Sequence, residues 1–317
     1  MRLCFIIDEK YRHQSMPLAV VHQLRQWGHD VDVLEPHATV IRLSDLVTQS
    51  YDAYVLKTAA DGPGLSLLEA AEAAGIPTIN NARSVRLVRD KAVAIAVAHA
   101  HGLPIPPAYF VAHPRLLAQI PLEDYPLVVK PSNGSACRDI YRVNHPADLA
   151  TLVLPDGARS FLLAQRYVQN TGFDVKLYVM GTQVYAVRKK SPLHPDVNGG
   201  EGLMPVTPEL RGLALNVGAL FGLDIYGVDV VETPEGWVGV DINDFPGFKG
   251  VPGAVDLIAT FILHVARRAK MQGPARAVRP QRRQDATVDG RSWRTDAESV
   301  RTAELPRRRI LTRRRHI

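Results

Sequence analysis

Apolar and polar residues alternate with two different periods along the first 80 residues. Short apolar runs rich in strand-forming residues occur at 2–7, 30–35, 53–58 and 76–80. Between them, 19–28 and 65–75 have the spacing of an amphipathic helix, and each ends at a glycine. Strand and helix patterns that alternate in this way predict an α/β domain with a mainly parallel sheet over residues 1–80.

After residue 80 the pattern favours paired strands. A long helical pattern at 84–102 stops at Gly102, and 126–143 has the strand, small-residue loop and strand of a hairpin. The remaining predicted elements are an apolar run at 160–168, strand pairs at 174–190 and 226–243, and helices at 208–221 and 254–269. We therefore expect two α+β subdomains, a central one at 81–160 and a C-terminal one at 161–270.

Hydrophobic periodicity ends near residue 271, and charge separates the last segment from the rest. The whole chain has a net charge of +6, but residues 271–317 contain 13 Arg against 5 Asp and Glu. This segment therefore carries +8, which leaves −2 for the other 270 residues. We expect a disordered Arg-rich tail at 271–317, and nucleic acid could bind only there.

The composition otherwise indicates an ordinary globular protein. Apolar residues make up 46% of the 317 positions, which is enough for a sizeable core. Cys4 and Cys137 form neither a metal spacing nor a disulfide framework. The N-terminus lacks a signal-peptide pattern, and no apolar stretch approaches the ~20 residues that cross a bilayer. We expect a cytoplasmic protein with no membrane partner.

The sequence DINDFPGFKG (241–250) ends an apolar strand with two carboxylates and an amide before a sharp turn. If the preceding hairpin has the three-residue loop 234–236, Asp229 pairs with Asp241. Asn243 then lies on the same face, because side chains alternate along a strand. This register predicts that the three oxygen-bearing side chains converge.

The same register pairs Val231 with Gly239, whose missing side chain would let a ligand approach this face. Two adjacent carboxylates repel each other unless a cation lies between them, and Mg²⁺ bound with ATP fits best, with Mn²⁺ as another choice. The alternative is that these are solvent-exposed residues at a strand end. A loop of two or four residues would also place Asp229 on the other face.

Lysines and small residues form a second group of candidates. Lys130 ends the apolar strand PLVVK, and the small-residue loop that follows it contains Ser135. The backbone N–H groups of such a loop can bind phosphate oxygens beside a lysine, although the P-loop pattern is absent. Taken alone, the stretch is more simply explained as a hairpin turn with one exposed lysine, although a buried strand that ends in a lone lysine calls for an anionic partner. Lys91, in a strongly apolar helix, also fits a solvent-facing position.

Basic residues continue on the strand pair at 174–190. Lys176 shares a strand face with Asp174, and Arg188 begins the run Arg188-Lys189-Lys190 on the next strand. These residues could form a cationic wall for a phosphate or carboxylate, or an exposed edge strand protected by charge. Before them, the backbone of residues 164–169 could contact an adenine edge.

The order of these segments resembles the ATP-grasp superfamily, and the nearest type is RimK-like. The resemblance covers about residues 80–266, with 1–80 similar to the domain that precedes an ATP-grasp fold. It rests on VRDK, PLVVKPSNG, LLAQRYV, the run at 206–231 and DINDFPGFKGV.

The resemblance implies a role for each candidate residue. Lys91, Lys130 and Ser135 would contact the phosphates of ATP, and Lys176 would reach them from a position where the ligases usually have Arg. The adenine would lie against Gln165, Arg166, Tyr167 and Val168, with Asp174 also on the nucleotide side. The residues implied for Mg²⁺ are Asp229, Asp241 and Asn243. Arg188 would approach the transferred phosphoryl group or the acceptor, which makes it and Lys176 the implied catalytic residues.

Two departures from the RimK-like pattern leave the reaction open. The metal segment has Asp241-Ile242-Asn243 where Glu-x-Asn is usual, and SPLHPDVNGGEG (191–202) replaces an Arg-Ser-Asn segment, with Asn198 as a stand-in. The Asp-Ile-Asn-x-Phe-Pro-Gly run is also similar to inositol polyphosphate kinases, although their His-Gly pair is missing.

Three functions follow from these observations. The leading hypothesis is a carboxylate–amine ligase that forms an acyl phosphate on a small-molecule or peptide substrate. The second is a kinase with the same nucleotide site and an alcohol acceptor. The third is a nucleotide-dependent protein that binds RNA or a ribosomal surface through the tail. We expect the acceptor between residues 1–80 and the loop 191–203, and the sequence leaves a homo-oligomer open.

Overall fold

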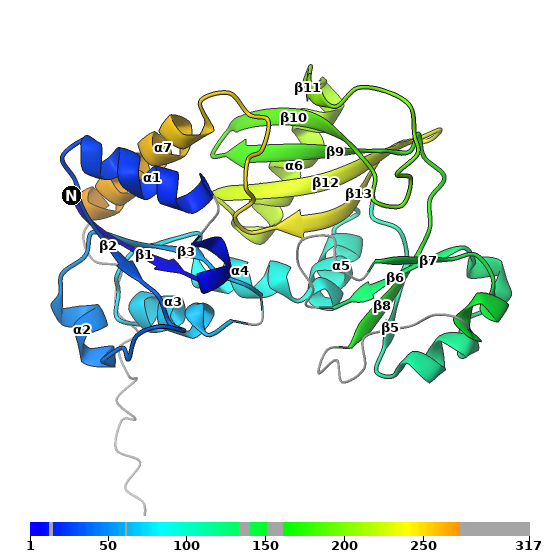
Figure 1. Cartoon of the computed structure of the whole chain (residues 1–317), viewed down its shortest axis with the longest axis horizontal. Helices are drawn as coiled ribbons and strands as arrows, with labels where there is room; N and C mark the ends of the chain where they lie inside the picture. The colour runs from blue at the N-terminus through cyan, green and yellow to red at the C-terminus, as the bar shows by residue number, and fades with distance from the viewer. Residues whose placement is uncertain (13–14, 61, 133–139, 151–160, 273–317) are drawn as a thin grey trace, which may run out of the picture. The chain divides into compact units, whose positions relative to one another are not determined.

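The computed structural model describes residues 1–12, 15–60, 62–132, 140–150 and 161–272 (Figure 1). All of these described residues belong to one compact unit. The tail predicted at 271–317 therefore lies almost wholly outside the described residues. The fold confirms the predicted mixed α/β class, because a parallel sheet precedes two antiparallel ones.

The first sheet is parallel and has the strand order β2-β1-β3-β4. Its strands are β1 (Arg2–Ile7), β2 (Asp30–Leu34), β3 (Ala53–Lys57) and β4 (Thr78–Ile79). The helices of this region are α1 (Ser15–Gln26), α2 (Leu43–Thr48) and α3 (Gly64–Ala73), and a short 3₁₀ helix η1 (Glu9–Tyr11) follows β1. The sequence pattern predicted all of these except α2 and η1.

The second sheet is antiparallel, with the order β5-β8-β6-β7. Its strands are β5 (Ala108–Val111), β6 (Leu127–Pro131), β7 (Tyr141–Val143) and β8 (Leu162–Arg166), and the 3₁₀ helices η2 (Pro114–Gln119), η3 (Leu122–Asp124) and η4 (Pro146–Ala150) lie beside it. We expected the apolar run at 160–168 to open the third unit. It instead forms β8, which pairs with both β5 and β6.

The third sheet is antiparallel, with the order β11-β10-β9-β12-β13. Its strands are β9 (Phe173–Met180), β10 (Gln183–Lys190), β11 (Gly202–Met204), β12 (Ile225–Thr233) and β13 (Gly236–Asn243). Helix α6 (Pro208–Phe221) packs on one face, where Val175, Leu177 and Val228 join its buried residues. Thr207 caps this helix and Gly222 ends it in the left-handed conformation, as its sequence predicts.

The long helix predicted at 84–102 is two helices, α4 (Ala82–Arg89) and α5 (Lys91–Ala100). Asp90 separates them because its backbone is extended and its carboxylate accepts hydrogen bonds from Ala92 N and Val93 N. An aspartate that caps a helix in this way competes with the helical conformation at its own position. Lys91 therefore lies at the start of a helix and not within one.

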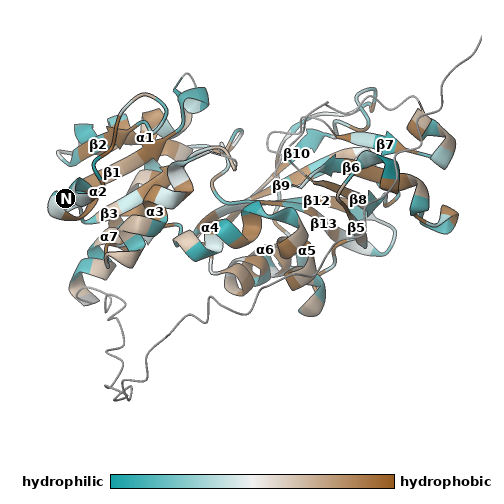
Figure 2. Cartoon of the chain, turned by 90° about the horizontal axis from the view of Figure 1, so that it is seen from below, coloured by the Kyte–Doolittle hydropathy of each residue, from teal (hydrophilic) through white to brown (hydrophobic). Residues whose placement is uncertain are grey.

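The last helix, α7 (Ala254–Gln272), packs with α1 on the N-terminal sheet (Figure 1). Its buried residues Ile258 and Ile262 belong to the same core as Phe5 and Leu24. Hydrophobic residues are concentrated on the strands and on the helix faces against them (Figure 2). The division of 1–270 into three subdomains stays a prediction, and α7 contacts the first sheet although it follows the third.

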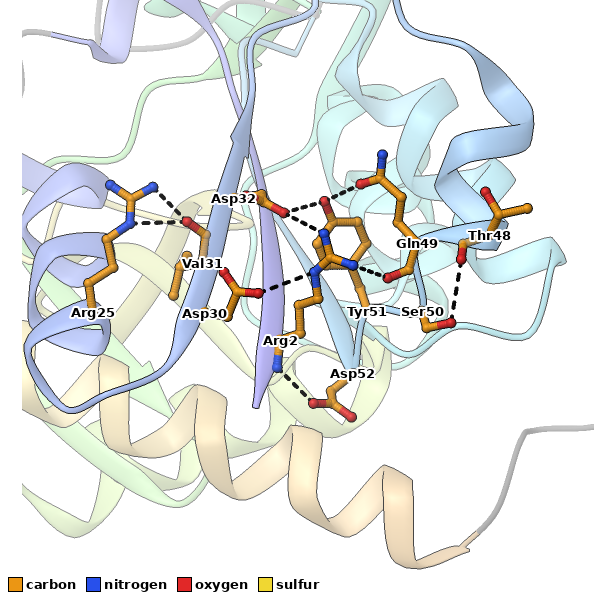
Figure 3. A network of polar contacts seen from close by, with 10 residues as sticks. All are labelled: Arg2, Arg25, Asp30, Val31, Asp32, Thr48, Gln49, Ser50, Tyr51 and Asp52. Atoms are coloured by element: carbon orange, nitrogen blue, oxygen red, sulfur yellow. Dashed lines mark hydrogen bonds and ion pairs between the residues drawn. The ribbon is translucent and has the colours of Figure 1, made fainter.

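A polar network joins the starts of the strands in the first sheet (Figure 3). The Arg2 guanidinium donates to Asp32 at 3.2 Å and to the Gln49 carbonyl at 2.6 Å. The hydroxyl of Tyr51 donates to Asp32 at 2.6 Å, and the backbone N–H of Arg2 donates to Asp52 at 2.8 Å. This network lies at the amino ends of the parallel strands, so their carboxyl ends are left for a binding site. None of the described helices is long and apolar enough to cross a membrane.

Candidate active site

One pocket brings together most of the predicted site residues. The elements around it are α5, the strands β6 and β8 of the second sheet, and the strands β9, β12 and β13 of the third. Nine of the predicted residues line this pocket: Lys91, Lys130, Gln165, Arg166, Tyr167, Val168, Asp174, Asp229 and Asp241. These residues come from four separate segments of the sequence, so the fold and not the chain order makes them neighbours.

Asp229 and Asp241 lie directly opposite each other on β12 and β13, which confirms the predicted pairing. The predicted three-residue loop is wrong, however, because Thr233 pairs with Gly236 and the turn has two residues. A β-bulge between Asp229 and Val230 adds one residue, Val240, to β13 and restores the aspartate pair. The bulge compensates for the shorter turn.

The bulge also corrects the prediction for Gly239. Gly239 pairs with Val230, which faces the apolar core beneath α6, and not with Val231. A side chain at Gly239 would meet Ile105 at 3.5 Å, so this glycine faces the segment after α5 and not the aspartates. Its backbone N–H donates to the Pro104 carbonyl at 2.7 Å.

Two lysines approach Asp241 from different elements. Lys91 at the start of α5 forms an ion pair with Asp241, and its backbone N–H donates to the Ser132 carbonyl at 3.2 Å. Lys130, at 7% exposure, donates to the Val240 carbonyl of the bulge at 2.9 Å and to Gln165 Oε1 at 3.2 Å. The bulge therefore supplies an acceptor that positions this lysine.

Oppositely charged side chains also pair across neighbouring strands of the third sheet. Lys176 pairs with Asp229 across β9 and β12, and their side chains are 2.5 Å apart. Burial favours the neutral form of Asp241, but Lys91 and Lys130 outweigh it and hold the pKa of this carboxyl below its usual value. The aspartate is therefore ionised at neutral pH, in the form that could bind a metal ion.

A different wall of the pocket is largely apolar and backbone-lined. Gln165 ends its buried strand by donating to the Pro106 carbonyl at 3.2 Å. The Tyr167 hydroxyl lies 2.7 Å from His194 Nε2, and the Arg142 guanidinium lies 4.1 Å from the Tyr167 ring centre. These contacts fix the segment 165–168 along this wall of the pocket.

Asp174 also lines this pocket and is buried. Burial raises the pKa of its carboxyl, and the nearby Lys176 offsets part of the effect. The sequence did not predict that Ser191, Leu193 and Asn170 also line the pocket. A signal for Asn170 was present, because Asn-Thr-Gly predicts a turn and its side chain accepts from Gly172 N at 2.8 Å.

The structure does not bring Arg188 to this pocket. Arg188 pairs with Val175 and therefore lies on the face opposite Lys176, where it donates to the Gly200 carbonyl at 2.9 Å and stacks on Phe173. Its neighbour Lys189 pairs with Asp174 and lies on the pocket face of the sheet. Because side chains alternate along β10, Lys189 and not the predicted Arg188 lies on the pocket face of the sheet.

Three other predicted site residues, and Asn198, are not among the described residues that line the pocket. Ser135 lies outside the described residues. Lys176 does not line the pocket itself but contacts it through Asp229. Asn243 pairs with Gly227 and shares the face of Asp241, one step further from the pocket. Asn198, the expected stand-in, is exposed.

Comparison with known proteins shows the family of this chain. The family model of the RimK-like ATP-grasp domain matches residues 88–263, more than half of the chain. The chain belongs to the RimK-like ATP-grasp family. This confirms the resemblance seen in the sequence, and all the pocket residues from α5 to β13 lie within the matched region.

Relatives of this RimK-like ATP-grasp protein are named as ligases. It is 25% identical to a probable alpha-L-glutamate ligase 1 of Shewanella amazonensis, over 81% of this chain and 94% of that one. A probable alpha-L-glutamate ligase of Marinomonas is 24% identical, over 77% and 89% of the two chains.

Solved structures of ATP-grasp proteins have the same fold. A RimK domain ATP-grasp protein from Sphaerobacter thermophilus aligns with a TM-score of 0.66 at 19% identity, covering 82% of this chain and 99% of that one. A D-alanine–D-alanine ligase from Bacillus anthracis aligns with a TM-score of 0.63 at 15% identity, covering 86% and 100%.

The donor set of the ATP-grasp site fits the magnesium ion that the family implies. Asp229 and Asp241 offer carboxylate oxygens from opposed positions, and the amide oxygen of Asn243 lies on the same face. Within the described ranges, no group of three or more His, Cys, Asp or Glu is placed to hold a metal ion, so the amide would have to be the third protein ligand.

Nucleotide binding would require the ion pairs of the pocket to separate. The cavity measures about 100 Å³, whereas small-molecule sites usually have roughly 300–1,000 Å³. Lys91 and Lys176 at present neutralise Asp241 and Asp229. A bound metal ion and triphosphate would replace these contacts pairwise, cation with carboxylate and phosphate with ammonium.

Proposed function

We propose that this protein is an ATP- and Mg²⁺-dependent carboxylate–amine ligase that works through an acyl phosphate. The single observation that carries the proposal is the convergence of Lys91, Lys130 and Lys176 with the opposed pair Asp229 and Asp241. The relatives named glutamate ligases support this reaction class over others.

Each wall of the pocket has a part in binding. The segment 165–168 would hold the adenine, and Lys91 and Lys130 would bind the phosphates once they leave their present partners. Asp229, Asp241 and Asn243 would hold Mg²⁺, which offsets the charge of the transferring phosphoryl group when bound. Asp174 would accept a hydrogen bond at the nucleotide end of the pocket.

Lys189 takes the role that the sequence suggested for Arg188. It lies on the same face as Lys176, on the next strand and two positions along, which brings the two side chains within about 8 Å at Cβ. Its ammonium group is 3.7 Å from Glu201, a loose contact that an incoming anion can replace. Lys176 and Lys189 would together stabilise charge on the transferred phosphoryl group.

The reaction then needs the protein to position its substrates, without a covalent bond between protein and substrate. An oxygen of the substrate carboxylate attacks the terminal phosphorus of ATP, and ADP leaves. A neutral amine attacks the carbonyl carbon of the acyl phosphate, phosphate leaves, and the amide nitrogen loses its proton to solvent. The lysines act by electrostatic stabilisation of both transition states.

Hydroxylamine trapping tests the ligase assignment. The protein is incubated with ATP, Mg²⁺ and each amino acid in turn, with and without hydroxylamine. Release of ADP together with an acyl hydroxamate is the expected result. ADP release with a phosphorylated alcohol and no hydroxamate would reject the ligase in favour of the kinase alternative.

Other features expected from the sequence stay predictions. They are the cytoplasmic location, a homo-oligomer, and binding of RNA through the tail, which lies outside the described residues from 273 onward. The acceptor is a small molecule or a peptide with a carboxylate, and its partner supplies the amine.

A further inference from the structure

Lys57 is the last residue of β3, and its ammonium group has hydrogen-bond donors that are not used within the described residues. Its ammonium group donates to the carbonyl of Phe245 and lies 4.6 Å from the centre of the Tyr11 ring. An ammonium group has three N–H donors. In the part of the chain that the structure describes, the Phe245 carbonyl is its only recorded hydrogen-bond acceptor, so two donors are available.

The charges around Lys57 leave it without an ion pair. The carboxylate that acts on its charge is Asp244, but Arg89 already binds both oxygens of Asp244, at 2.9 and 3.3 Å. Lys10 on η1 adds a second positive charge nearby. By contrast, Lys91, Lys176 and Lys270 each contact a carboxylate.

Burial and these neighbours act on the protonation of Lys57. Burial lowers the pKa of its ammonium group, Asp244 raises it, Arg89 and Lys10 lower it further, and the result is about 8. The Tyr11 ring faces the group from η1. A cation that is costly to keep in place and has no counter-ion is a candidate for binding an anion.

The position of Lys57 in the sheet is the one where ligands bind in α/β folds. The order β2-β1-β3-β4 reverses direction between β1 and β3, and the crevice outside the carboxyl ends of these two strands is the usual binding position. Asp8 at the end of β1 is joined to β3 there, because its backbone N–H donates to the Lys57 carbonyl at 3.1 Å.

This end of β3 is next to the segment proposed to bind the metal. Phe245, whose carbonyl binds Lys57, is four residues after Asp241 on one continuous segment. Four extended residues span at most about 13 Å, which is comparable to the length of an amino acid plus a phosphoryl group. A substrate can therefore contact Lys57 with one end and reach the phosphoryl site with the other.

We propose that Lys57, with the ring of Tyr11 beside it, binds a carboxylate group of the amino acid that supplies the amine. The inference rests on the proposed ligase function and adds the chemical class of the second substrate. A carboxylate fits better than a phosphate dianion, because one ammonium group with two available donors matches two oxygens and Asp244 lies close by. Arg89 holds Asp244 and so keeps it from neutralising Lys57.

Binding without turnover tests the site independently of the reaction. The full-length protein, with Mg²⁺ and a nonhydrolysable ATP analogue, is screened by thermal shift against the twenty L-amino acids. The strongest binder is then titrated calorimetrically beside its α-carboxamide. We expect Lys57→Gln to weaken binding of the amino acid about tenfold or more, with the affinity for the ATP analogue unchanged within twofold.

Two further variants separate the charge of Lys57 from the fold around it. Lys57→Arg keeps the charge and is expected to retain most of the affinity. Lys270→Gln removes a lysine of α7 that contacts Asp52 before the amino end of β3, and it is expected to change nothing. In steady-state assays, Lys57→Gln is expected to raise KM for the amino acid about tenfold and to leave kcat within twofold.

The pH dependence gives a readout that a structural role would not move. Wild-type affinity for the amino acid is expected to fall between pH 7 and 9 as Lys57 loses its proton, whereas Lys57→Arg shows no such fall beyond the titration of the ligand itself. Unchanged affinity in Lys57→Gln, or no saturable binding of any amino acid by the wild type, would overturn the proposal. A failed hydroxamate assay with intact, Lys57-dependent binding would reject only the ligase reaction.

Discussion

At the residue scale, burial and the neighbouring lysines have opposite effects on the charge of Asp241. It contacts Lys91, has Lys130 nearby and faces Asp229 across the hairpin. We expect Asp241→Asn to reduce turnover at least 100-fold, because the amide lacks the negative charge that a divalent cation needs. The melting temperature should change by only a few degrees, since the side chain keeps its shape.

A matched aspartate controls for the loss of an ion pair as such. Asp52 contacts Lys270 at 2.9 Å, far from the pocket in the same chain. Asp52→Asn is expected to leave turnover and its Mg²⁺ dependence unchanged. Full Mg²⁺-dependent activity in Asp241→Asn would show that the metal assignment is wrong.

Lys57 also makes a prediction about stability. Its pKa in the folded protein is about 8, below the 10.5 of the free side chain, so the unfolded chain binds more protons between these values. Stability contributed by this group therefore rises with pH from about 8 to 10. We expect Lys57→Met to be more stable relative to wild type at pH 7 than at pH 10, measured by urea unfolding at both values.

Single residues also show what the sequence could not determine. Arg188 and Lys189 are adjacent basic residues, and composition does not distinguish them. Only the register of β10 against β9 shows that Lys189 shares the face of Lys176. The lysines and aspartates of the pocket were predictable because their types and order are unusual, whereas the facing of a strand depends on pairing with a distant segment.

At the element scale, the hairpin of β12 and β13 shows how a correct pairing can follow from a wrong loop. The sequence TPEG fits a two- or a three-residue turn, and the choice shifts every pair by one. The bulge at Val240 removes that shift before Asp229 and Asp241 meet. A bulge has no reliable sequence signal, because it is set by the neighbours on both sides, here Lys130 and the Pro104 segment.

At the break between α4 and α5, a substitution tests how the start of a helix positions the pocket residue Lys91. Asp90→Ala removes the cap of α5 and favours one continuous helix, which would cost about 1 kcal/mol and displace Lys91. We expect weaker ATP binding together with a lower free energy of unfolding, measured by nucleotide titration and urea unfolding.

Two variants separate the effect of losing a helix cap from the effect of displacing Lys91 in the pocket. Asp90→Asn keeps a capping side chain and should retain ATP affinity. Thr207→Ala removes the cap of α6, which binds Leu210 N at 3.3 Å, and should lower stability by a similar amount with ATP affinity unchanged. Equal loss of ATP affinity in Thr207→Ala and Asp90→Ala would mean that general destabilisation is the cause.

At the scale of the whole molecule, the core of the N-terminal sheet depends on the last helix. Ile258 and Ile262 of α7 are fully buried in the same cluster as strand β1. A chain that ends at residue 253 would expose this core, so we expect it to be insoluble or to lose cooperative unfolding. A chain that ends at residue 272 retains α7 and should unfold at the wild-type temperature, as measured by calorimetry.

The comparison of residues 1–272 with the full chain also tests the remaining functional hypothesis. Residues 271–317 carry +8, while the other 270 carry −2, so electrostatic attraction to RNA would reside in the removed segment. If the tail binds RNA, the full chain should bind it with an affinity that falls steeply with salt, and residues 1–272 should bind at least tenfold more weakly at low salt. ATP turnover should be equal in the two proteins, because every described residue of the pocket lies before residue 242. RNA affinity that is the same with and without the tail would place any such binding on the folded body, against its negative charge, and would reject the tail as the contact.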